Sequence, residues 1–164
     1  MQLRIATIAD QDSIAALIER VFHEYSERIC LEYCDSDLVN LESDYFNKGG
    51  TFWVLEEAGH VLGSSAVVPD ESKQGVCWLK RLYLDSNLRG TNWGRTLMQL
   101  AIDWAEEREF SRMVFWSDVR FERAHRFYEK QGCHRTGEIR TMVDSYIPYH
   151  EYFFTLQLPA KVSS

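Results

Sequence analysis

The spacing of hydrophobic residues changes along the chain, and these changes predict the order of its helices and strands. The first segment, Leu3 to Ile8, is typical of a short strand. Asp10 follows it as the expected N-cap of a helix. One face of that helix is marked by apolar residues at helical spacing, which are Ile14, Leu17, Ile18, Val21, Phe22 and Tyr25. Between Glu24 and Asp44 the period is weak, so we expect only one or two short surface helices there.

From Thr51 onward, apolar residues recur at the spacing of β-strands. The runs TFWVLEE and HVLGSSAVV are joined by Ala58-Gly59, which predicts a hairpin. The run VCWLKRLYLD follows a polar turn and predicts a third, longer strand.

The second half of the chain alternates helices with strands. It begins with a helix, one face of which is marked by Leu97, Leu100, Ala101, Trp104 and Arg108. Met113 to Val119 predicts the next strand. The run RFERAHRFYEKQG predicts a helix with Gly132 as its C-cap, and YFFTLQL predicts a last strand, alone or with another before it. A hairpin-rich half joined to strand–helix–strand units predicts a mixed α/β sheet.

Composition and charge narrow the class of protein. The 164 residues suit one domain, over residues 1–164, with a sizeable core, since 45% of them are hydrophobic. The formal net charge of −7 argues against partners that need a cationic face, namely nucleic acid and an anionic membrane surface. No apolar run near the N-terminus has the length of a signal peptide, so we expect a cytoplasmic protein.

The cysteines and histidines do not favour a metal site. Cys30 and Cys34 are four residues apart, but no second Cys or His pair completes a zinc set and no HExxH motif occurs. With Cys77 and Cys133, they are expected to be reduced thiols in core or boundary positions. We therefore expect no metal ion.

A run of small, polar and turn-forming residues, LDSNLRGTNWGRTLM, precedes the first helix of the second half. The first turn of a helix carries unpaired N–H groups and a partial positive charge, which together bind phosphate oxygens. Gly90 and Gly94 lack side chains that would keep a diphosphate away, and Arg89 and Arg95 add positive charge. Asn92 is expected to adopt a left-handed conformation in place of a glycine. A plain turn before a helix is the alternative.

Two segments resemble motifs of one enzyme family. Arg89 to Gly94 resembles the Arg/Gln-x-x-Gly-x-Gly/Ala acyl-CoA loop of the GNAT superfamily of N-acetyltransferases, with Asn92 where the first glycine is expected. Ala124 to Gly132 resembles the A-x-x-F-Y-E-K-x-G helix of the same superfamily. The loop matches neither a Walker P-loop nor a Rossmann fingerprint.

The resemblance implies a fold and a cosubstrate. The fold is expected to be α/β, the GNAT fold, with a mixed, mostly antiparallel sheet flanked by helices. The sheet is expected to be splayed in the middle, between the strands Cys77 to Asp85 and Met113 to Val119. The cosubstrate is expected to be acetyl-CoA, with its pantetheine arm in the splay. The residues implied to bind it are Leu82, Tyr83, Leu84, Arg89, Gly90, Thr91, Asn92, Trp93, Gly94, Arg95 and Thr96.

Tyr128 matches the tyrosine that acts as general acid in many members of the superfamily. The resemblance implies that its phenol protonates the departing thiolate when an acetyl group is transferred to an amine. The demand on this acid is modest because the thiol formed has a pKa of roughly 8.5, by analogy with cysteine. A strand N–H, that of Leu82 or a neighbour, is expected to polarise the thioester carbonyl. A purely structural role, in which Tyr128 packs in the core with Phe127, is the alternative.

No residue stands out as the general base that would deprotonate the amine. Glu24, Asp85 and Asp118 are candidates, although such carboxylates are more often capping or surface groups. Water is the alternative proton acceptor.

Departures from the family pattern motivate a second function. Phe121 stands where many members carry an asparagine, three residues before the helix alanine, and Asn92 replaces a glycine of the loop. The strand before the loop lacks the acidic residue of some members, since Trp78, Lys80 and Arg81 occupy that stretch. The alternative to an N-acetyltransferase is therefore a non-catalytic acyl-CoA-binding or regulatory domain.

The acceptor is expected to be a primary amine of a small molecule or peptide, acetylated by direct transfer. Glu24, Tyr25 and the acidic segment after them lie where the family places substrate-facing helices, and carboxylates there would hold a cationic amine. A solvated acidic face is the alternative. Trp53 and Trp78 are candidates for the lining of the acceptor pocket, with a core role as the alternative for both. Asp118 completes the residues expected near the acceptor. A homodimer is compatible with the sequence.

Overall fold

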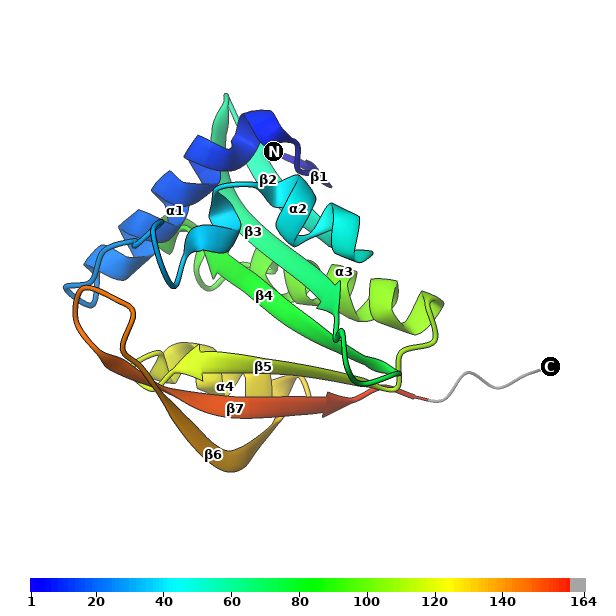
Figure 1. The fold of residues 1–164 in the computed structure, drawn as a ribbon. Coiled ribbons are helices and arrows are strands. Elements are labelled where there is room, and N and C mark those ends of the chain that lie inside the picture. Colours follow the sequence, from blue (N-terminus) through cyan, green and yellow to red (C-terminus); the bar gives the residue numbers. More distant parts are fainter. Residues whose placement is uncertain (160–164) are drawn as a thin grey trace.

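The computed structural model describes residues 1–159 and forms one seven-stranded sheet with helices on both faces (Figure 1). The strands are β1 (Gln2–Ile5), β2 (Thr51–Glu57), β3 (His60–Pro69), β4 (Val76–Leu84), β5 (Arg112–Asp118), β6 (His134–Met142) and β7 (Tyr149–Gln157). The helices are α1 (Gln11–His23), α2 (Leu41–Asp44), α3 (Trp93–Glu107) and α4 (Glu122–Lys130). The strands lie in the order β1-β2-β3-β4-β5-β7-β6, and of these neighbours β4 and β5 are parallel. This mixed, mostly antiparallel sheet confirms the predicted fold class.

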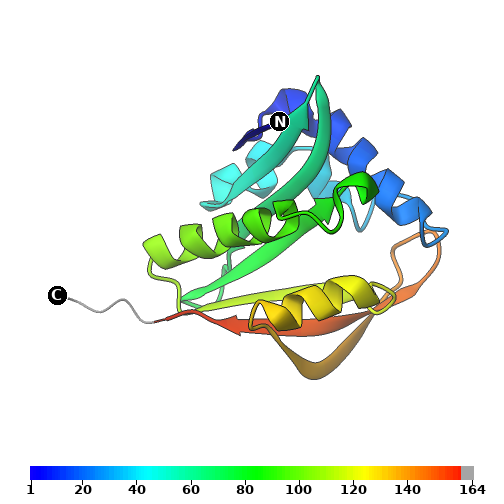
Figure 2. The same cartoon turned by 180° about the vertical axis from the view of Figure 1, so that it is seen from behind.

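The helices form a layer on each face of the sheet. α1 and α2 lie on the near face in Figure 1, whereas α3 and α4 lie on the face seen in Figure 2. A buried cluster that includes Ile14 and Phe52 packs beneath α1 and α2. A second cluster, which includes Met98 and Phe115, packs beneath α3 and α4. The helical spacing of apolar residues in α1 and α3 is thus explained by burial of one face of each helix.

The strands β4 and β5 pair over only a short stretch. Their parallel register runs from Val76 opposite Arg112 to Trp78 opposite Val114, and the described residues form no later pair between them. β4 nevertheless continues to Leu84, and β5 pairs with β7 instead over its whole length. β4 and β5 therefore diverge toward the left of Figure 1. The predicted splay of the sheet is confirmed.

A bulge interrupts β4 within its separated part. The register of β4 against β3 shifts between Lys80 and Tyr83, so that Arg81 and Leu82 together stand opposite a single residue of β3. Arg81 has a φ of 54°, in the left-handed region that residues other than glycine seldom adopt. The Ser64 hydroxyl donates to the Arg81 carbonyl at 2.6 Å and supports this turn of the backbone.

The start of the chain differs from its prediction. β1 ends at Ile5 rather than Ile8, because the chain turns at Thr7 into the short 3-10 turn that leads to α1. Asp10 precedes α1, but its side chain makes no capping hydrogen bond to that helix. Its carboxylate accepts the Thr7 N–H at 2.7 Å and the two terminal nitrogens of Arg4 at 2.8 Å. A charged partner thus replaces the expected capping contact.

Other predicted elements are confirmed with small shifts of their ends. Ala58 and Gly59 form the turn between β2 and β3, with φ of 51° and 80°. α4 ends at Lys130, and Gly132 then makes a left-handed turn with a φ of 93°. β7 begins earlier than predicted, and β6 precedes it as its antiparallel partner. Within residues 1–159, no helix combines the length and the hydrophobicity that a membrane crossing requires.

Candidate active site

A cleft of about 1030 Å³ lies between the separated parts of β4 and β5. Residues from both strands, the end of α1, the segment after it, the start of α3, α4 and the β6–β7 hairpin line the cleft. The sheet divides the lining into two sides. The "α3 side" includes Leu84, Gly90 and Tyr128, and the "α1 side" includes Trp78 and Lys80.

The α3 side ends at the N-terminus of α3. Asn92 occupies the N-cap position, but its side chain makes no capping hydrogen bond, and the first turn holds no acidic residue. A Cβ atom added at Gly90 would meet no atom within 4 Å, and one added at Gly94 would meet only Leu84, at 3.9 Å. Arg95 lines the cleft beside them. Open backbone, a helix N-terminus and positive charge together fit a diphosphate.

The left-handed residue of this loop is Gly90. Its φ is 80°, whereas Asn92 has a φ of −78° and a ψ of 0°, which is a right-handed helical conformation. The prediction of a left-handed Asn92 is wrong because the chain has already turned at Gly90 and Asn92 leads directly into α3. The lining of the cleft includes Arg89, Gly90, Thr91, Gly94 and Arg95 but not Asn92, Trp93 or Thr96.

The separated part of β4 presents a backbone edge to the cleft. Leu82, Tyr83 and Leu84 all line it, as expected. Leu82 packs against the cluster beneath α3 and α4, whereas Tyr83 packs against the cluster beneath α1 and α2. Beyond Trp78 no described strand pairs with this edge, so its backbone groups are free to bond with an extended ligand.

Tyr128 lies on α4 and lines the cleft, with 7% of its surface exposed. Its ring packs edge-on against Phe115, with 4.7 Å between centroids, and against Phe154, with 5.5 Å. Burial raises the pKa of the Tyr128 phenol above its ordinary value of 10.0, so the group keeps its proton at neutral pH. The ring therefore has the packing role proposed as the alternative, while the protonated hydroxyl is still available as an acid.

Two of the three general-base candidates lie outside the cleft lining. Glu24 forms an ion pair with Arg89 at 2.6 Å, and Asp85 forms one with Arg20 at 3.3 Å. Asp85 also accepts the backbone N–H of Asn87 at 3.1 Å. Each carboxylate is thus held by an arginine, and Glu24 is not one of the residues that face the cleft.

Arg120 holds the third candidate at the open end of the α1 side. It donates to the two oxygens of Asp118, at 3.0 and 2.6 Å, and lies 3.4 Å from Glu27 Oε1. Arg120 also donates to the Tyr25 carbonyl at 3.4 Å. Tyr25 and Asp118 line the cleft as predicted, but the charge of Asp118 is already compensated.

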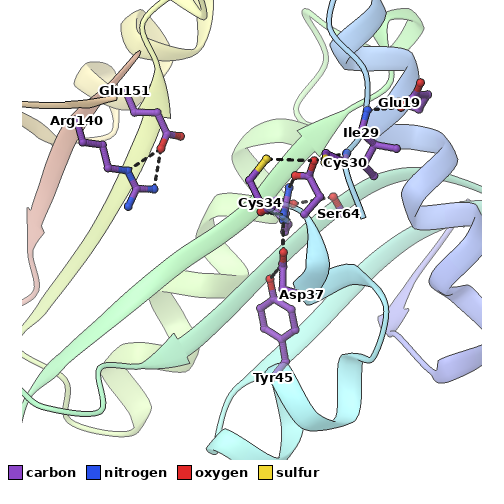
Figure 3. A network of polar contacts seen from close by, with 11 residues as sticks. Glu19, Ile29, Cys30, Cys34, Asp37, Tyr45, Ser64, Arg140 and Glu151 are labelled. Carbon is purple, nitrogen blue, oxygen red and sulfur yellow. Dashed lines mark hydrogen bonds and ion pairs between the residues drawn. The ribbon is translucent and has the colours of Figure 1, made fainter. Parts of the chain in front are cut away.

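The Arg81 guanidinium is buried on the α1 side between two carboxylates of the segment that follows α1. Figure 3 shows one of these carboxylates, Asp37, beside Tyr45. Arg81 donates to Asp35 at 2.9 Å and to Asp37 at 2.5 and 3.0 Å. The Tyr45 hydroxyl also donates to Asp37. Burial opposes ionisation of Asp37, but Arg81 outweighs burial and holds the pKa of this carboxyl below its ordinary value. These two carboxylates therefore already have an internal cation.

Glu151 and Arg140 stand apart from Asp37 and Tyr45 in Figure 3 and come from the last two strands. Arg140 donates to Glu151 Oε1 through Nε at 2.8 Å, and its Nη2 lies 2.6 Å from the same oxygen. Burial raises the pKa of Glu151 despite this ion pair. Glu151 is therefore a better proton acceptor than an ordinary surface carboxylate.

Sequence reasoning missed the roles of Arg81, Arg120 and Glu151. The adjacent charges of Lys80 and Arg81, inside an otherwise apolar strand, were the available signal for a bulge, because one of two consecutive residues should face the core. Trp78 lines the cleft as expected, whereas Trp53 is 9% exposed and belongs to the core.

Comparisons with known proteins agree with this arrangement. A model of the acetyltransferase (GNAT) family matches residues 15–133. The chain is 29% identical over 133 residues to the uncharacterized N-acetyltransferase YjgM of Escherichia coli (strain K12), covering 79% of this chain and 80% of that protein. It is 31% identical over 119 residues to N-acetylaspartate synthetase of Danio rerio, covering 70% of this chain but 42% of that protein.

Solved structures share the fold. An acetyltransferase of the GNAT family from Staphylococcus aureus Mu50 superposes with a TM-score of 0.81 at 18% identity, covering 96% of this chain and 99% of that one. YncA from Salmonella typhimurium, solved with acetyl-CoA, has a TM-score of 0.74 at 21% identity, covering 100% of this chain and 97% of that one.

The chain belongs to the GNAT family of acetyltransferases, because the family model matches well over half of it. It is an acyltransferase, and acetyl-CoA is its cosubstrate, as the two sequence motifs predict. An amine-bearing acceptor follows from the family in general.

Replacing Arg81 with Met should destabilise the fold strongly, because it leaves Asp35 and Asp37 in the cleft wall without their cation. We expect a loss of about 3–5 kcal/mol in the free energy of unfolding at pH 7, measured by urea denaturation. The folded pKa of Asp37 is lowered, so the stabilisation is present above its unfolded pKa of about 4 and is lost as the pH falls through the folded value. The difference in the free energy of unfolding between Arg81→Met and the wild type should therefore become smaller at acidic pH.

Arg20→Met is the matched control, since Arg20 is 49% exposed and its ion pair with Asp85 is screened. It should cost less than about 1 kcal/mol. Equal losses in the two variants, or a loss at Arg81 that does not change with pH, would contradict the role assigned to the buried pair.

Proposed function

We propose that this chain is an N-acetyltransferase that moves an acetyl group directly from acetyl-CoA to a primary amine of a small molecule or peptide. The observation that carries the proposal is the single cleft that joins the uncapped N-terminus of α3, the unpaired edge of β4 and the buried Tyr128. One bound acyl-CoA would use all three of these features. The name of the fish relative states an acetylated amino acid, which supports a small amine as acceptor.

The residues of the α3 side suit acetyl-CoA. The backbone at Gly90 and Gly94, with Arg95, would hold the diphosphate at the helix N-terminus. The free edge of β4 from Leu82 to Leu84 would pair with the amide groups of pantetheine. Arg89 would bind the phosphates of the cosubstrate, either by leaving its ion pair with Glu24 or by contacting both groups.

The transfer needs a polarised carbonyl, a proton for the leaving sulfur and a proton acceptor for the amine. A backbone N–H in the bulge of β4 would polarise the thioester carbonyl while the amine nitrogen bonds to the carbonyl carbon and the carbon–sulfur bond breaks. Tyr128 would give its phenol proton to the sulfur and regain a proton from solvent. The proton lost by the amine would pass to water and from there to Glu151, a carboxylate of the cleft lining with a raised pKa.

Direct transfer is favoured over a cysteine-bound intermediate. Cys34 lines the cleft, and the other described cysteines do not. Burial, aided by Asp35, raises the pKa of Cys34 to about 11, so its thiol stays protonated and is a poor nucleophile.

The alternative of a non-catalytic acyl-CoA-binding domain loses support. It depends on Asn92 and Phe121, but Asn92 has an ordinary helical conformation that needs no glycine. Phe121 packs against Tyr25 in a tilted arrangement, with 4.8 Å between ring centroids, and helps to form the wall of the cleft. A cytoplasmic location and a single domain over residues 1–164 stay predictions.

Gly94→Val should abolish the increase in melting temperature that CoA causes, because the added side chain would occupy the place of the diphosphate. The fold should survive, since a Cβ at Gly94 comes no closer than 3.9 Å to Leu84. A ligand that binds only the folded state raises the melting temperature by mass action, so the shift reports binding. Gln99→Val, on the exposed face of the same helix, is the control and should keep the shift. An undiminished shift in Gly94→Val would remove the loop from the site.

Tyr128→Phe should lower kcat by about 10- to 1,000-fold and leave the affinity for CoA nearly unchanged, because the hydroxyl acts on the leaving sulfur in the transition state. Stability should change little, since the ring contacts with Phe115 and Phe154 remain. Because burial raises the pKa of Tyr128, its ionisation should not reduce the wild-type rate below pH 10.

Tyr33→Phe, at a side chain that is 63% exposed, controls for loss of a hydroxyl elsewhere. Both variants should be assayed for CoA release under conditions in which chemistry limits the rate. If Tyr128→Phe turns over as fast as wild type, Tyr128 is a packing residue and another group protonates the thiolate.

A further inference from the structure

The α1 side of the cleft presents a lysine beside an aromatic surface. Trp78 and Lys80 are two residues apart on β4, so their side chains leave the same face of the strand. Trp78 packs against the cluster beneath α1 and α2, which places this face on the α1 side. Both residues line the cleft.

The aromatic surface lies where the two strands begin to separate. Trp78 belongs to the last pair between β4 and β5, and Trp116 of β5 follows just beyond it. Phe153 of β7 bridges them, with its centroid 6.0 Å from the ring of Trp78 and 4.7 Å from that of Trp116. The Trp78 indole donates to Asp70 at 2.8 Å, which fixes the orientation of the ring. Trp78 and Trp116 are thus held on either side of the narrow end of the cleft.

Lys80 has no ionic partner in the described part of the chain. No described carboxylate oxygen lies within 4.0 Å of its ammonium group, although acidic residues line the same cleft. Most of these already have a cation, since Asp35 and Asp37 pair with Arg81 and Glu151 pairs with Arg140. Lys80 is exposed within the cleft, so the anion of a ligand that enters the cleft can reach its ammonium group.

The charges around Lys80 support this interpretation. Burial lowers its pKa, Asp37 opposes this effect, and Arg81, Arg140 and Lys48 add to it. The single favourable carboxylate is already bonded to Arg81. A bound anion would relieve the mutual repulsion of these cations and oppose the lowering of the Lys80 pKa.

From this juxtaposition we infer that the acceptor is an amine that also carries a carboxylate and an aromatic ring, with an aromatic α-amino acid as the matching class. Lys80 binds the carboxylate, and Trp78 and Trp116 hold the ring. The inference rests on the proposed N-acetyltransferase activity and names the acceptor of that same cleft.

The order of these residues along β4 suits such an acceptor. An α-amino acid carries its amine, carboxylate and side chain on one carbon atom. Trp78 and Lys80 are neighbours on one face, and the bulge at Arg81 follows directly. A ligand whose ring lies on Trp78 and whose carboxylate binds Lys80 therefore presents its amine next to the bulge, where the proposed mechanism polarises the thioester.

This acceptor differs from the cationic amine expected from the acidic segment after Glu24. That expectation needs free carboxylates on the α1 side. Asp35 and Asp37 are bonded to Arg81, and Asp118 is bonded to Arg120. Lys80, which lies beside Trp78, is instead a cation with no described carboxylate within 4.0 Å.

The test compares matched amines with acetyl-CoA and follows the release of CoA. L-phenylalanine should exceed both L-phenylalaninamide, which lacks the carboxylate, and L-alanine, which lacks the ring, by about 10- to 100-fold in kcat/KM. In Lys80→Met the ratio of phenylalanine to its amide should fall to about one, through a higher KM for phenylalanine, and Lys80→Arg should restore part of it. In Trp116→Leu the ratio of phenylalanine to alanine should fall instead.

Lys130→Met removes a lysine at the end of α4, outside the cleft lining, and should keep both ratios. Quenching of tryptophan fluorescence by N-acetyl-L-phenylalanine, compared with its amide in the presence of CoA, measures recognition without turnover. Carboxylate-dependent quenching that Lys80→Met abolishes supports the inference even if no amine releases CoA, in which case the proposed activity fails separately. Turnover of amines with no preference for a carboxylate or a ring, or quenching that is equal for acid and amide, overturns the inference and leaves the acetyltransferase proposal intact.

Discussion

The early end of pairing between β4 and β5 is the constraint on which the rest of the structure depends. The last pair between the two strands is Trp78 with Val114. Beyond it they separate, and β4 keeps an unpaired backbone edge as far as Leu84. An exposed edge of this kind is normally a liability in a β-sheet. Here helices cover both faces of the sheet, so the edge borders a cleft with two chemically different sides. The splay of the sheet and the cleft therefore both result from the early end of hydrogen bonding between β4 and β5.

The bulge at Arg81 links this interruption to the wall of the cleft. It places consecutive charged residues on β4, one of which is bonded internally while Lys80 has no counter-ion. The left-handed backbone of Arg81 is unfavourable by itself, and the bonds of its guanidinium to Asp35 and Asp37 compensate for it. The segment after α1, which has little regular structure, is thereby fixed against the strand that borders the proposed thioester site. The position and the charge of the α1 side of the cleft thus depend on the buried ion pairs of Arg81 with Asp35 and Asp37.

Local periodicity predicted the mixed α/β sheet, and two continuous motifs that resemble those of the GNAT family predicted its splay and the α3 side of the cleft. A continuous segment from Leu84 to Gly94 contains the strand end, the turn and the helix start. The errors arose where neighbours outweigh local preference, as at Asp10, which bonds to Arg4, and at Asn92, whose expected turn occurs at Gly90. The α1 side was not predictable in this way, since its charges come from separate elements and their pairing depends on tertiary contacts.

Amide hydrogen exchange with and without CoA tests the central claim most directly, that one ligand occupies both the free edge of β4 and the N-terminus of α3. The account predicts slower exchange on CoA binding in the peptides that cover Leu82–Leu84 and Gly90–Thr96. The peptides of β1 and β2, at the far edge of the sheet, should not change. Unchanged exchange in the β4 peptide at saturating CoA, or protection confined to the segment after α1, would contradict it.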